Sequence, residues 1–128
     1  MKIIGIGIDI VEIKRIKKIF YKFKNRFAHK ILSINEWNYY IKNNNKHNIY
    51  YLAKRFAIKE SAVKALHTGF TNGIFFNQFE LYSNKNGKPK LKFFNQALNI
   101  VNKMQYKNIH ISLSDEKKYV CAIVIIEG

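Results

Sequence analysis

Acidic side chains are scarce in this chain of 128 residues. Eight Asp and Glu stand against 23 Lys and Arg, so the net charge is +15 at pH 7, and only two of the eight are aspartates, Asp9 and Asp115. A chain this basic is expected to meet an anionic partner, which leaves nucleic acid, a membrane surface, an acidic protein and a polyphosphate ligand as alternatives. Because acidic residues are so few, each one becomes a candidate for a specific role.

Cysteine and long apolar runs are scarce as well. Cys121 is the only cysteine, which excludes an intrachain disulfide and a thiolate-rich metal site. The longest apolar runs, such as residues 120–126, are too short to cross a bilayer, and the N-terminus shows neither the apolar stretch nor the cleavage site of a signal peptide. We therefore expect a cytoplasmic protein with no membrane partner.

Linkers and repeats are missing from the sequence too. The chain has one proline, six glycines and no Ser/Pro/Gly-rich stretch, and 48% of its residues are hydrophobic. This composition is typical of a globular protein rather than a disordered one. The length suits one hydrophobic core, so we expect a single domain over residues 1–128.

Residues 2–10 alternate between two kinds of side chain, which predicts a β-strand. One face is apolar and consists of Ile4, Ile6, Ile8 and Ile10. The other face is nearly bare, with Gly5 and Gly7 followed by Asp9. Glycine weakens a strand, so the two glycines indicate close approach by another backbone or by a ligand. The pattern is not a dinucleotide-binding fingerprint, because the third glycine is missing.

Three helices are predicted between this strand and residue 69. The first covers residues 11–27 and would bury apolar side chains at helical spacing, namely Ile13, Ile16, Phe20, Phe23 and Phe27. Ser33 and Glu36 form a capping box that opens the second helix, which ends in a polar run at residues 43–46. The third helix covers about residues 49–67, with Gly69 as its terminator.

Strands dominate the second half of the chain. Strand-like segments at residues 75–82 and 91–94 flank a turn at residues 84–87, and a short helix follows at about residues 95–105. Residues 109–114 and 119–126 have the pattern of a closing hairpin. Helices early and strands late predict an α+β fold in which helices pack on a mostly antiparallel sheet.

Asp9 and Glu60 are the carboxylates most suited to chemistry. Asp9 ends a strand beside two glycines, although a carboxylate at the start of the next helix explains it equally well. Glu60 and Lys64 lie four residues apart on the third helix, which is also the spacing of an ordinary surface ion pair. The functional alternative is that the two carboxylates hold Mg²⁺, which takes only one or two of them, while Lys64 contacts phosphate. His110 shares a polar strand face with Ser112 and Ser114, which suits phosphate, although most lone histidines on strands are structural or simply exposed.

Four motifs occur in the order found in a known family. They are Gly5-Ile6-Gly7-Ile8-Asp9-Ile10-Val11-Glu12-Ile13, then Arg55-Phe56-Ala57-Ile58-Lys59-Glu60-Ser61 with Lys64-Ala65, then Gly87-Lys88-Pro89, and last His110-Ile111-Ser112-Leu113-Ser114-Asp115 with Tyr119-Val120-Cys121-Ala122. In order and spacing over the whole chain, they resemble the motifs of the acyl-carrier-protein synthases, the short bacterial members of the 4′-phosphopantetheinyl transferase superfamily. Each motif alone is modest, whereas four in register are very specific.

The resemblance implies a function and a set of roles. The function is transfer of the 4′-phosphopantetheine group of coenzyme A to a serine of apo acyl carrier protein, with release of adenosine 3′,5′-bisphosphate, in support of fatty acid biosynthesis. Asp9 and Glu60 would hold Mg²⁺ and, with Lys64, form the catalytic group. The residues implied for binding coenzyme A are Arg55, Lys64, Thr68, Gly69, Gly87, Lys88, Pro89 and His110. The base that takes the serine proton stays open between Glu60 and a metal-bound water.

The resemblance also implies partners. Members of the family are homotrimers with active sites at subunit interfaces, and they dock the acidic carrier protein on their basic first helix. The docking residues implied here are Lys14, Arg15, Lys18 and Lys22. One departure concerns the turn after the third helix, where the family has Gly-Thr-Gly and this chain has His67-Thr68-Gly69. We expect His67 to strain or reshape that turn, because a glycine there permits a positive φ.

Two other classes of protein compete with this interpretation. A metal-dependent nuclease would gather Asp9, Glu60 and Asp115 around two metal ions and would bind nucleic acid on the basic surface. A non-catalytic nucleic-acid-binding module would combine the same charge with the aromatic side chains, which make up 15% of the chain. We favour neither, because Asp115 lies in a predicted turn and many of the aromatic residues lie on buried stripes. We therefore expect no nucleic-acid partner.

Overall fold

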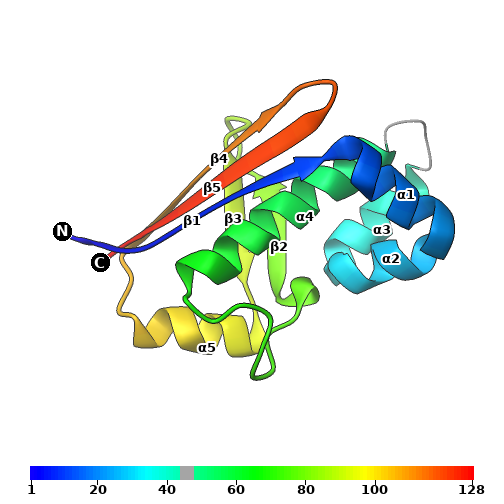
Figure 1. Ribbon diagram of the computed structural model, residues 1–128. Helices are drawn as coiled ribbons and strands as arrows, with labels where there is room; N and C mark the ends of the chain where they lie inside the picture. Colours follow the sequence, from blue (N-terminus) through cyan, green and yellow to red (C-terminus); the bar gives the residue numbers. More distant parts are fainter. Residues whose placement is uncertain (44–47) are drawn as a thin grey trace.

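The structure is a computed structural model that describes residues 1–43 and 48–128. It has the predicted α+β fold with antiparallel sheets. The larger sheet has the strand order β1-β5-β4, in which β1 is Ile3–Glu12, β5 is Tyr119–Glu127 and β4 is Asn108–Asp115. Helix α4, Asn48–Ala65, packs along one face of this sheet, mainly against β1 and β5 (Figure 1).

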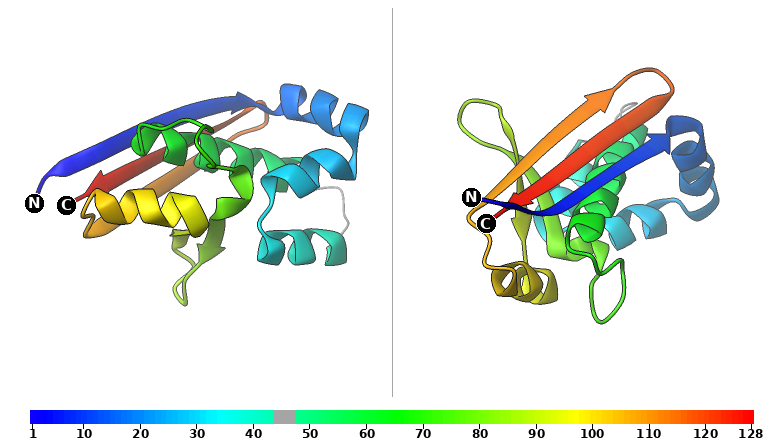
Figure 2. Two further views of the ribbon diagram at one scale, coloured as in Figure 1. Left: turned by 90° about the horizontal axis from the view of Figure 1, so that it is seen from below. Right: turned by 60° about the vertical axis from the view of Figure 1, so that its left-hand side comes forward.

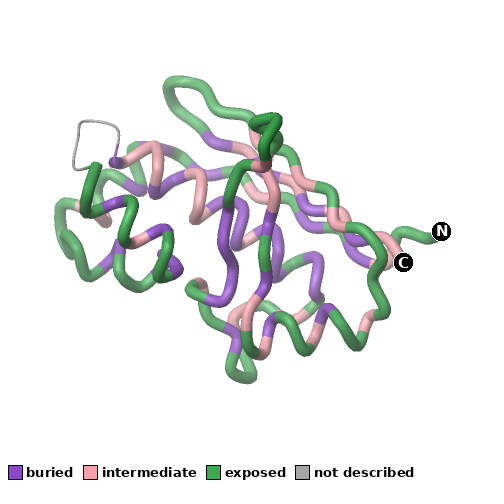
Figure 3. Tube along the Cα trace, turned by 180° about the vertical axis from the view of Figure 1, so that it is seen from behind, coloured by how far each residue is buried: buried purple, intermediate pink, exposed green. Residues whose placement is uncertain are grey.

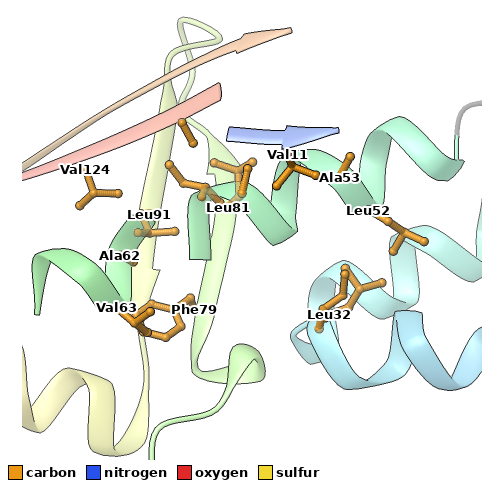
Figure 4. Close-up of a cluster of buried hydrophobic side chains, with 14 of the residues drawn as sticks. Val11, Leu32, Leu52, Ala53, Ala62, Val63, Phe79, Leu81, Leu91 and Val124 are labelled. Carbon is orange, nitrogen blue, oxygen red and sulfur yellow. The ribbon is translucent and has the colours of Figure 1, made fainter. Parts of the chain in front are cut away.

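A second, two-stranded sheet lies on the other side of α4 (Figure 2). It consists of β2, Phe79–Ser83, and β3, Pro89–Phe93; the short helix η1, Phe76–Gln78, precedes it and α5, Asn95–Lys103, follows it. The hydrophobic core lies between the two sheets around α4. Figure 4 shows core side chains of α4, β2, β3 and β5, among them Val63, Phe79, Leu91 and Val124.

The predicted helix over residues 11–27 is wrong in extent. Strand β1 continues to Glu12, and the helical segment is divided into α1, Ile13–Phe23, and α2, Asn25–Ile31, at Lys24, whose φ is +52°. A straight helix could not direct the apolar residues of both halves toward the same core, so the chain changes direction between them. As a consequence, Phe23 is 43% exposed, although the spacing had predicted a buried position.

Helix α3, Ile34–Lys42, begins with the predicted capping box. The backbone N–H of Glu36 donates to Ser33 Oγ at 3.3 Å, and the backbone N–H of Ser33 donates to Glu36 Oε1 at 2.9 Å. Residues 44–46, most of the polar run predicted to end this helix, lie outside the described residues.

Helix α4 ends two residues earlier than predicted. The N–H of Thr68 donates to the carbonyl of Val63 and that of His67 to the carbonyl of Lys64, which is the pairing of a Schellman motif. His67 occupies the position that usually carries glycine, and its φ is +63°. The turn keeps its geometry despite the histidine, so the expected strain is stored in the backbone of His67.

The two faces of β1 have unexpected environments. The glycine face is the buried one: a Cβ built on Gly7 would lie 1.9 Å from the carbonyl oxygen of Ser61, and one on Gly5 would lie 2.2 Å from that of Ala65. The glycines thus admit the backbone of α4, one of the two predicted reasons for them. The isoleucine face is open, with Ile6, Ile8 and Ile10 exposed by 56%, 58% and 65%. Figure 3 shows the burial concentrated on the elements that surround α4.

Candidate active site

Asp9, Glu60 and Lys64 come together where β1 crosses α4. Asp9 lies on the face of β1 that meets α4 and pairs with Ala122 of β5. Lys64 Nζ donates to Asp9 Oδ1 at 3.1 Å and to the carbonyl oxygen of Ile8 at 2.9 Å. Among the described residues, the ion pair of Lys64 is therefore with Asp9 rather than with Glu60, so the surface-pair interpretation of Glu60 and Lys64 does not hold.

Glu60 belongs to this group because it interacts electrostatically with Asp9 and Lys64. Burial raises the pKa of Glu60 above its usual value, and the negative charge of Asp9 raises it further, whereas Lys64 and Arg15 oppose the shift. The two carboxylates are thus close enough to repel each other. The site is half open, because the Asp9 side chain is 17% exposed and that of Lys64 is 51% exposed.

The backbone of α4 is held in place beside the carboxylates. Ser61, which follows Glu60, donates its hydroxyl to the carbonyl oxygen of Ala122 at 3.0 Å, and Ala122 is the partner of Asp9 in the sheet. Together with the close approach at Gly7, this bond fixes the distance between the strand that carries Asp9 and the helix that carries Glu60. Gly5 and Gly7 of β1, together with Ser61 of α4, therefore position the site.

The residues predicted to bind coenzyme A are spread over the chain. Thr68 and Gly69 lie in the loop after α4, and Gly87, Lys88 and Pro89 lie at the β2–β3 turn, where Asn84 Oδ1 accepts from the N–H of Lys88 at 3.0 Å. His110 lies on the outer face of β4, and its Nε2 is 3.5 Å from Glu127 Oε1. His110 lies opposite Ile125 on the open face of the larger sheet, whereas Asp9 lies on the face that meets α4. The assignment of these residues to coenzyme A stays a prediction.

Arg55 has partners that the sequence did not indicate. Its Nε lies 3.5 Å from Glu36 Oε2, and its guanidinium lies over the ring of Tyr51. Lys59 is fully buried and donates to Glu36 Oε1. The sequence predicted this buried group of charges for neither residue. The capping box already explained Glu36, and nothing in the pattern distinguishes a buried lysine from an exposed one in a helix.

The cations predicted to dock the carrier protein all lie exposed on α1. They are Lys14, Arg15, Lys18 and Lys22, and within residues 1–43 and 48–128 none of them forms an ion pair. Beside this helix is a hollow of about 380 Å³ lined by apolar side chains, including Phe27 and Phe56, with Arg26 and Lys30 among its lining. The basic helix is thus next to an apolar recess and, through Arg15, next to Glu60.

The carboxylate cluster required by the nuclease alternative is not formed. Asp115 pairs with Lys54 at 3.7 Å. Across the described parts of the chain, no group of three or more His, Cys, Asp or Glu side chains is placed to hold a metal ion. The same residues include no helix that is both long and apolar enough to cross a membrane.

Comparison with known proteins agrees with the geometry. Residues 5–124 match the 4′-phosphopantetheinyl transferase superfamily. Over 127 residues the chain is 56% identical to the holo-[acyl-carrier-protein] synthase of Buchnera aphidicola subsp. Schizaphis graminum (strain Sg), and the match covers 99% of each. The crystal structure of the holo-[acyl-carrier-protein] synthase from Neisseria meningitidis is similar with a TM-score of 0.89 at 35% identity, covering 99% of this chain and 100% of that one.

A second solved structure contains a ligand. The holo-(acyl-carrier-protein) synthase from Bacillus anthracis str. Ames, in complex with CoA (3′,5′-ADP), is similar with a TM-score of 0.79 at 32% identity, over 98% of this chain and 96% of that one. The chain therefore belongs to the 4′-phosphopantetheinyl transferase superfamily. Within that superfamily it is a transferase of the holo-[acyl-carrier-protein] synthase type, as the four motifs predicted.

Proposed function

We propose that this transferase moves the 4′-phosphopantetheine group of coenzyme A to a serine of an apo acyl carrier protein, releases adenosine 3′,5′-bisphosphate, depends on Mg²⁺ and supports fatty acid biosynthesis in the cytoplasm. The observation that carries the proposal is the convergence of Asp9, Glu60 and Lys64 at a half-open surface. The complex of the Bacillus anthracis relative with CoA (3′,5′-ADP) supports the choice of substrate and product.

The donor set fits a magnesium ion. Mg²⁺ prefers carboxylate oxygens, is usually held by one or two of them, and leaves its other positions to phosphate and water. Asp9 and Glu60 would hold it, and their mutual repulsion, which raises the pKa of Glu60, would be relieved by a divalent cation. When bound, the ion supplies neutralisation of the negative charge on the pyrophosphate oxygens.

The protein's own part in the reaction is positioning and charge. The serine hydroxyl attacks the β-phosphorus and would give its proton to Glu60 or to a metal-bound water. The bond from that phosphorus to the bridging oxygen breaks, and adenosine 3′,5′-bisphosphate leaves. Lys64 is exposed enough to turn from Asp9 to a phosphate oxygen while it remains at the site. A group held in place before the reaction contributes more to the rate than one that must be recruited.

The open face of the larger sheet supports a homotrimer. Register places Ile6 opposite Ile125 and Ile8 opposite Ile123 on this face, so apolar side chains of two strands lie together without cover. Exposed apolar patches of this kind mark interaction surfaces. Because His110 and Asp9 lie on opposite faces of the larger sheet in one copy, a coenzyme A molecule that contacts both would lie between two copies.

The trimer has a direct test. Ile8→Asp would place a charge in the centre of the open face and should convert the assembly to monomers, as measured by light scattering after size exclusion. Tyr106→Asp, on an exposed residue outside this face, is the matched control. A variant at Ile8 that keeps the mass of the wild type would remove this face from the interface.

Carrier docking on α1 follows from charge and shape. Four exposed cations that form no ion pair with any described residue would attract an acidic protein and raise its rate of association. The apolar recess beside them, lined by Phe27 and Phe56, would accept an apolar side chain from the same partner. Both features lie on the same side as Arg15, which acts on Glu60, so a docked carrier would present its serine near the site.

The decisive experiment is intact-mass analysis of an apo acyl carrier protein incubated with the enzyme, coenzyme A and Mg²⁺. A gain of one phosphopantetheine, abolished by a chelator and by Asp9→Ala or Glu60→Ala, is the expected result. No gain with a folded enzyme and a competent carrier would refute the proposed reaction, and full turnover by both variants would refute the metal assignment.

A further inference from the structure

A single buried carboxylate, that of Glu36, joins four elements of the fold. Its Oε1 accepts from Lys59 Nζ of α4 at 2.5 Å, and its Oε2 accepts from the backbone N–H of Leu81 in β2 at 2.8 Å. Lys59 also donates to the carbonyl oxygen of Ile31 at the end of α2 at 2.6 Å. With the capping box of α3, the carboxylate has a full set of short partners. Two of the chain's few carboxylates, Glu36 and Glu80, are spent inside the protein here.

Arg55 is the weakest partner of that carboxylate. Its Nε lies 3.5 Å from Glu36 Oε2, beyond all the other contacts of Glu36, and this buried nitrogen makes no hydrogen bond within the described residues. Lys59 Nζ already donates to Glu36 Oε1, although burial lowers the pKa of Lys59, while Glu80, the other buried carboxylate nearby, accepts from the hydroxyl of Ser33 at 2.7 Å. The carboxylate of Glu36 thus has its hydrogen bonds without Arg55, and the guanidinium of Arg55 remains available to another anion.

Tyr51 fixes the plane of the Arg55 guanidinium. The guanidinium carbon lies 3.6 Å from the centroid of the Tyr51 ring, which is the distance of close stacking. Tyr51 is held in turn by its hydroxyl, which donates to the backbone carbonyl of Glu36 at 3.0 Å, and by the stacked ring of Tyr39 at 5.4 Å. Burial raises the pKa of Tyr51 to about 12, so the ring stays neutral beneath the cation.

The side chain of Arg55 reaches the surface of the protein. Its side chain is 16% exposed and lines a hollow of about 530 Å³ together with Tyr50, Tyr51, Lys54 and Asp115. In that hollow Lys54 Nζ lies 3.7 Å from the carboxylate of Asp115, whereas the carboxylate that Arg55 contacts is Glu36, 3.5 Å from its Nε. A guanidinium held at one edge and on one face presents its other nitrogens as a fork, which matches two oxygens of a phosphate.

We propose that Glu36 and Tyr51 are positioning residues that orient Arg55 as a fixed phosphate receptor for coenzyme A. The inference rests on the proposed function, and it adds to it the reason why an arginine stands at this position. The negative charge of Glu36, 3.5 Å from Nε, orients the edge of the guanidinium, and Tyr51 sets its plane. The short contact of Lys59 with Oε1 keeps the carboxylate from drawing Arg55 inward. A mobile cation at the same place would also attract phosphate, but it would bind more weakly, because its side chain would lose conformational entropy on binding.

The test is calorimetric titration with adenosine 3′,5′-bisphosphate, accompanied by transfer kinetics. Tyr51→Leu removes the stacking surface and is expected to weaken binding by about three- to fivefold. Arg55→Lys keeps the charge but loses the fork and the stack, and is expected to weaken binding at least as much. Tyr51→Phe keeps the ring and loses only the hydroxyl, so its affinity is expected to stay within about twofold of that of the wild type. In transfer assays, the KM for coenzyme A should rise while kcat and the KM for the carrier stay unchanged.

The role of Glu36 needs a variant that can fold, because Glu36→Gln alone leaves Lys59 buried without its charge partner. The double change Glu36→Gln and Lys59→Met removes both charges together and keeps the volume. It is expected to fold, as judged by circular dichroism, and to weaken binding about as much as Tyr51→Leu. Wild-type affinity in this double variant would overturn the role of Glu36. Wild-type affinity in both Tyr51→Leu and Arg55→Lys would overturn the receptor altogether.

The outcomes separate this inference from the proposed function. If the wild type binds the nucleotide in a manner that depends on Arg55 and Tyr51 but transfers nothing to a carrier, the receptor stands and the proposed reaction fails. If transfer proceeds and the variants bind as the wild type does, the reaction stands and the receptor fails.

Discussion

Replacing Gly7 with alanine should move Glu60 away from Asp9. The added Cβ would lie 1.9 Å from the carbonyl oxygen of Ser61 and 2.8 Å from the backbone nitrogen of Ala65, whereas ordinary contact begins at 3.4 Å. Both obstacles are backbone atoms, so no side chain can turn away. Helix α4 would therefore have to move from β1 by about 1.5 Å, and Glu60, the neighbour of Ser61, would move with it.

The structure sets the size of the effect. Overpacking of a core costs about 1–3 kcal/mol, and a backbone collision belongs at the upper end of that range. For a protein of this length, about 3 kcal/mol corresponds to a fall in Tm on the order of 10 °C. Displacement of a reacting group by about 1 Å costs on the order of 100-fold in rate, so turnover should fall by about that factor even in the folded protein.

A matched control separates displacement from strain. Gly73, unlike Gly7, has a positive φ, +84°, and a Cβ there would meet only Gln96 Cγ at 3.9 Å. Gly73→Ala should cost about 1–2 kcal/mol from its backbone conformation and leave kcat unchanged below Tm. Calorimetry and transfer kinetics at low temperature would measure both variants. A Gly7→Ala enzyme with the wild-type Tm and kcat would refute the argument that α4 rests on this glycine.

Three further variants test other parts of the site. Burial and Asp9 raise the pKa of Glu60, so the stability that its protonated form contributes is present at low pH and is lost as pH rises through the raised pKa. Glu60→Gln should therefore raise the Tm of the metal-free protein at pH 7 while abolishing transfer. A lower Tm would contradict the cause assigned to the pKa shift. His67→Gly should stabilise the protein by about 1 kcal/mol, because glycine adopts the φ of +63° without strain. The loss of the 3.3 Å contact between Nε2 and the carbonyl oxygen of Ile4 offsets part of this gain. Chemical denaturation measures the net change, and a destabilisation of the same size would show that this contact dominates. Charge reversal at Arg15 and Lys18 should raise the KM for the carrier at low salt and spare the KM for coenzyme A, and the same reversal at Lys103 and Lys107, exposed outside α1, should change neither.

Part of the site could be predicted because its signals are local. A strand that ends in Gly-Ile-Gly-Ile-Asp, a capping box at Ser33 and the spacing of Glu60 and Lys64 are patterns within a few residues of one another. Local patterns fixed the class of fold, the family and the three residues that the structure brings together. The relatives confirm the family, whereas the individual roles of the residues stay predictions.

Other parts could not be predicted, because they depend on residues distant in sequence. The division of the first helix at Lys24 follows from where the core lies relative to α1 and α2, and helical spacing continues through such a break. The burial of Lys59 depends on Glu36, 23 residues away, and on the carbonyl of Ile31. A lysine between apolar residues has the same pattern whether it faces solvent or a buried carboxylate.

The clearest division lies in β1. Its sequence determined that isoleucines occupy one face and glycines the other, because side chains alternate along any strand. Only the tertiary structure decided that the glycine face is buried and the isoleucine face open, since that choice depends on whether the backbone of α4 can come within contact of β1. The close approach that Gly5 and Gly7 permit brings the helix that carries Glu60 and Lys64 to Asp9, and it leaves the isoleucines of the opposite face exposed.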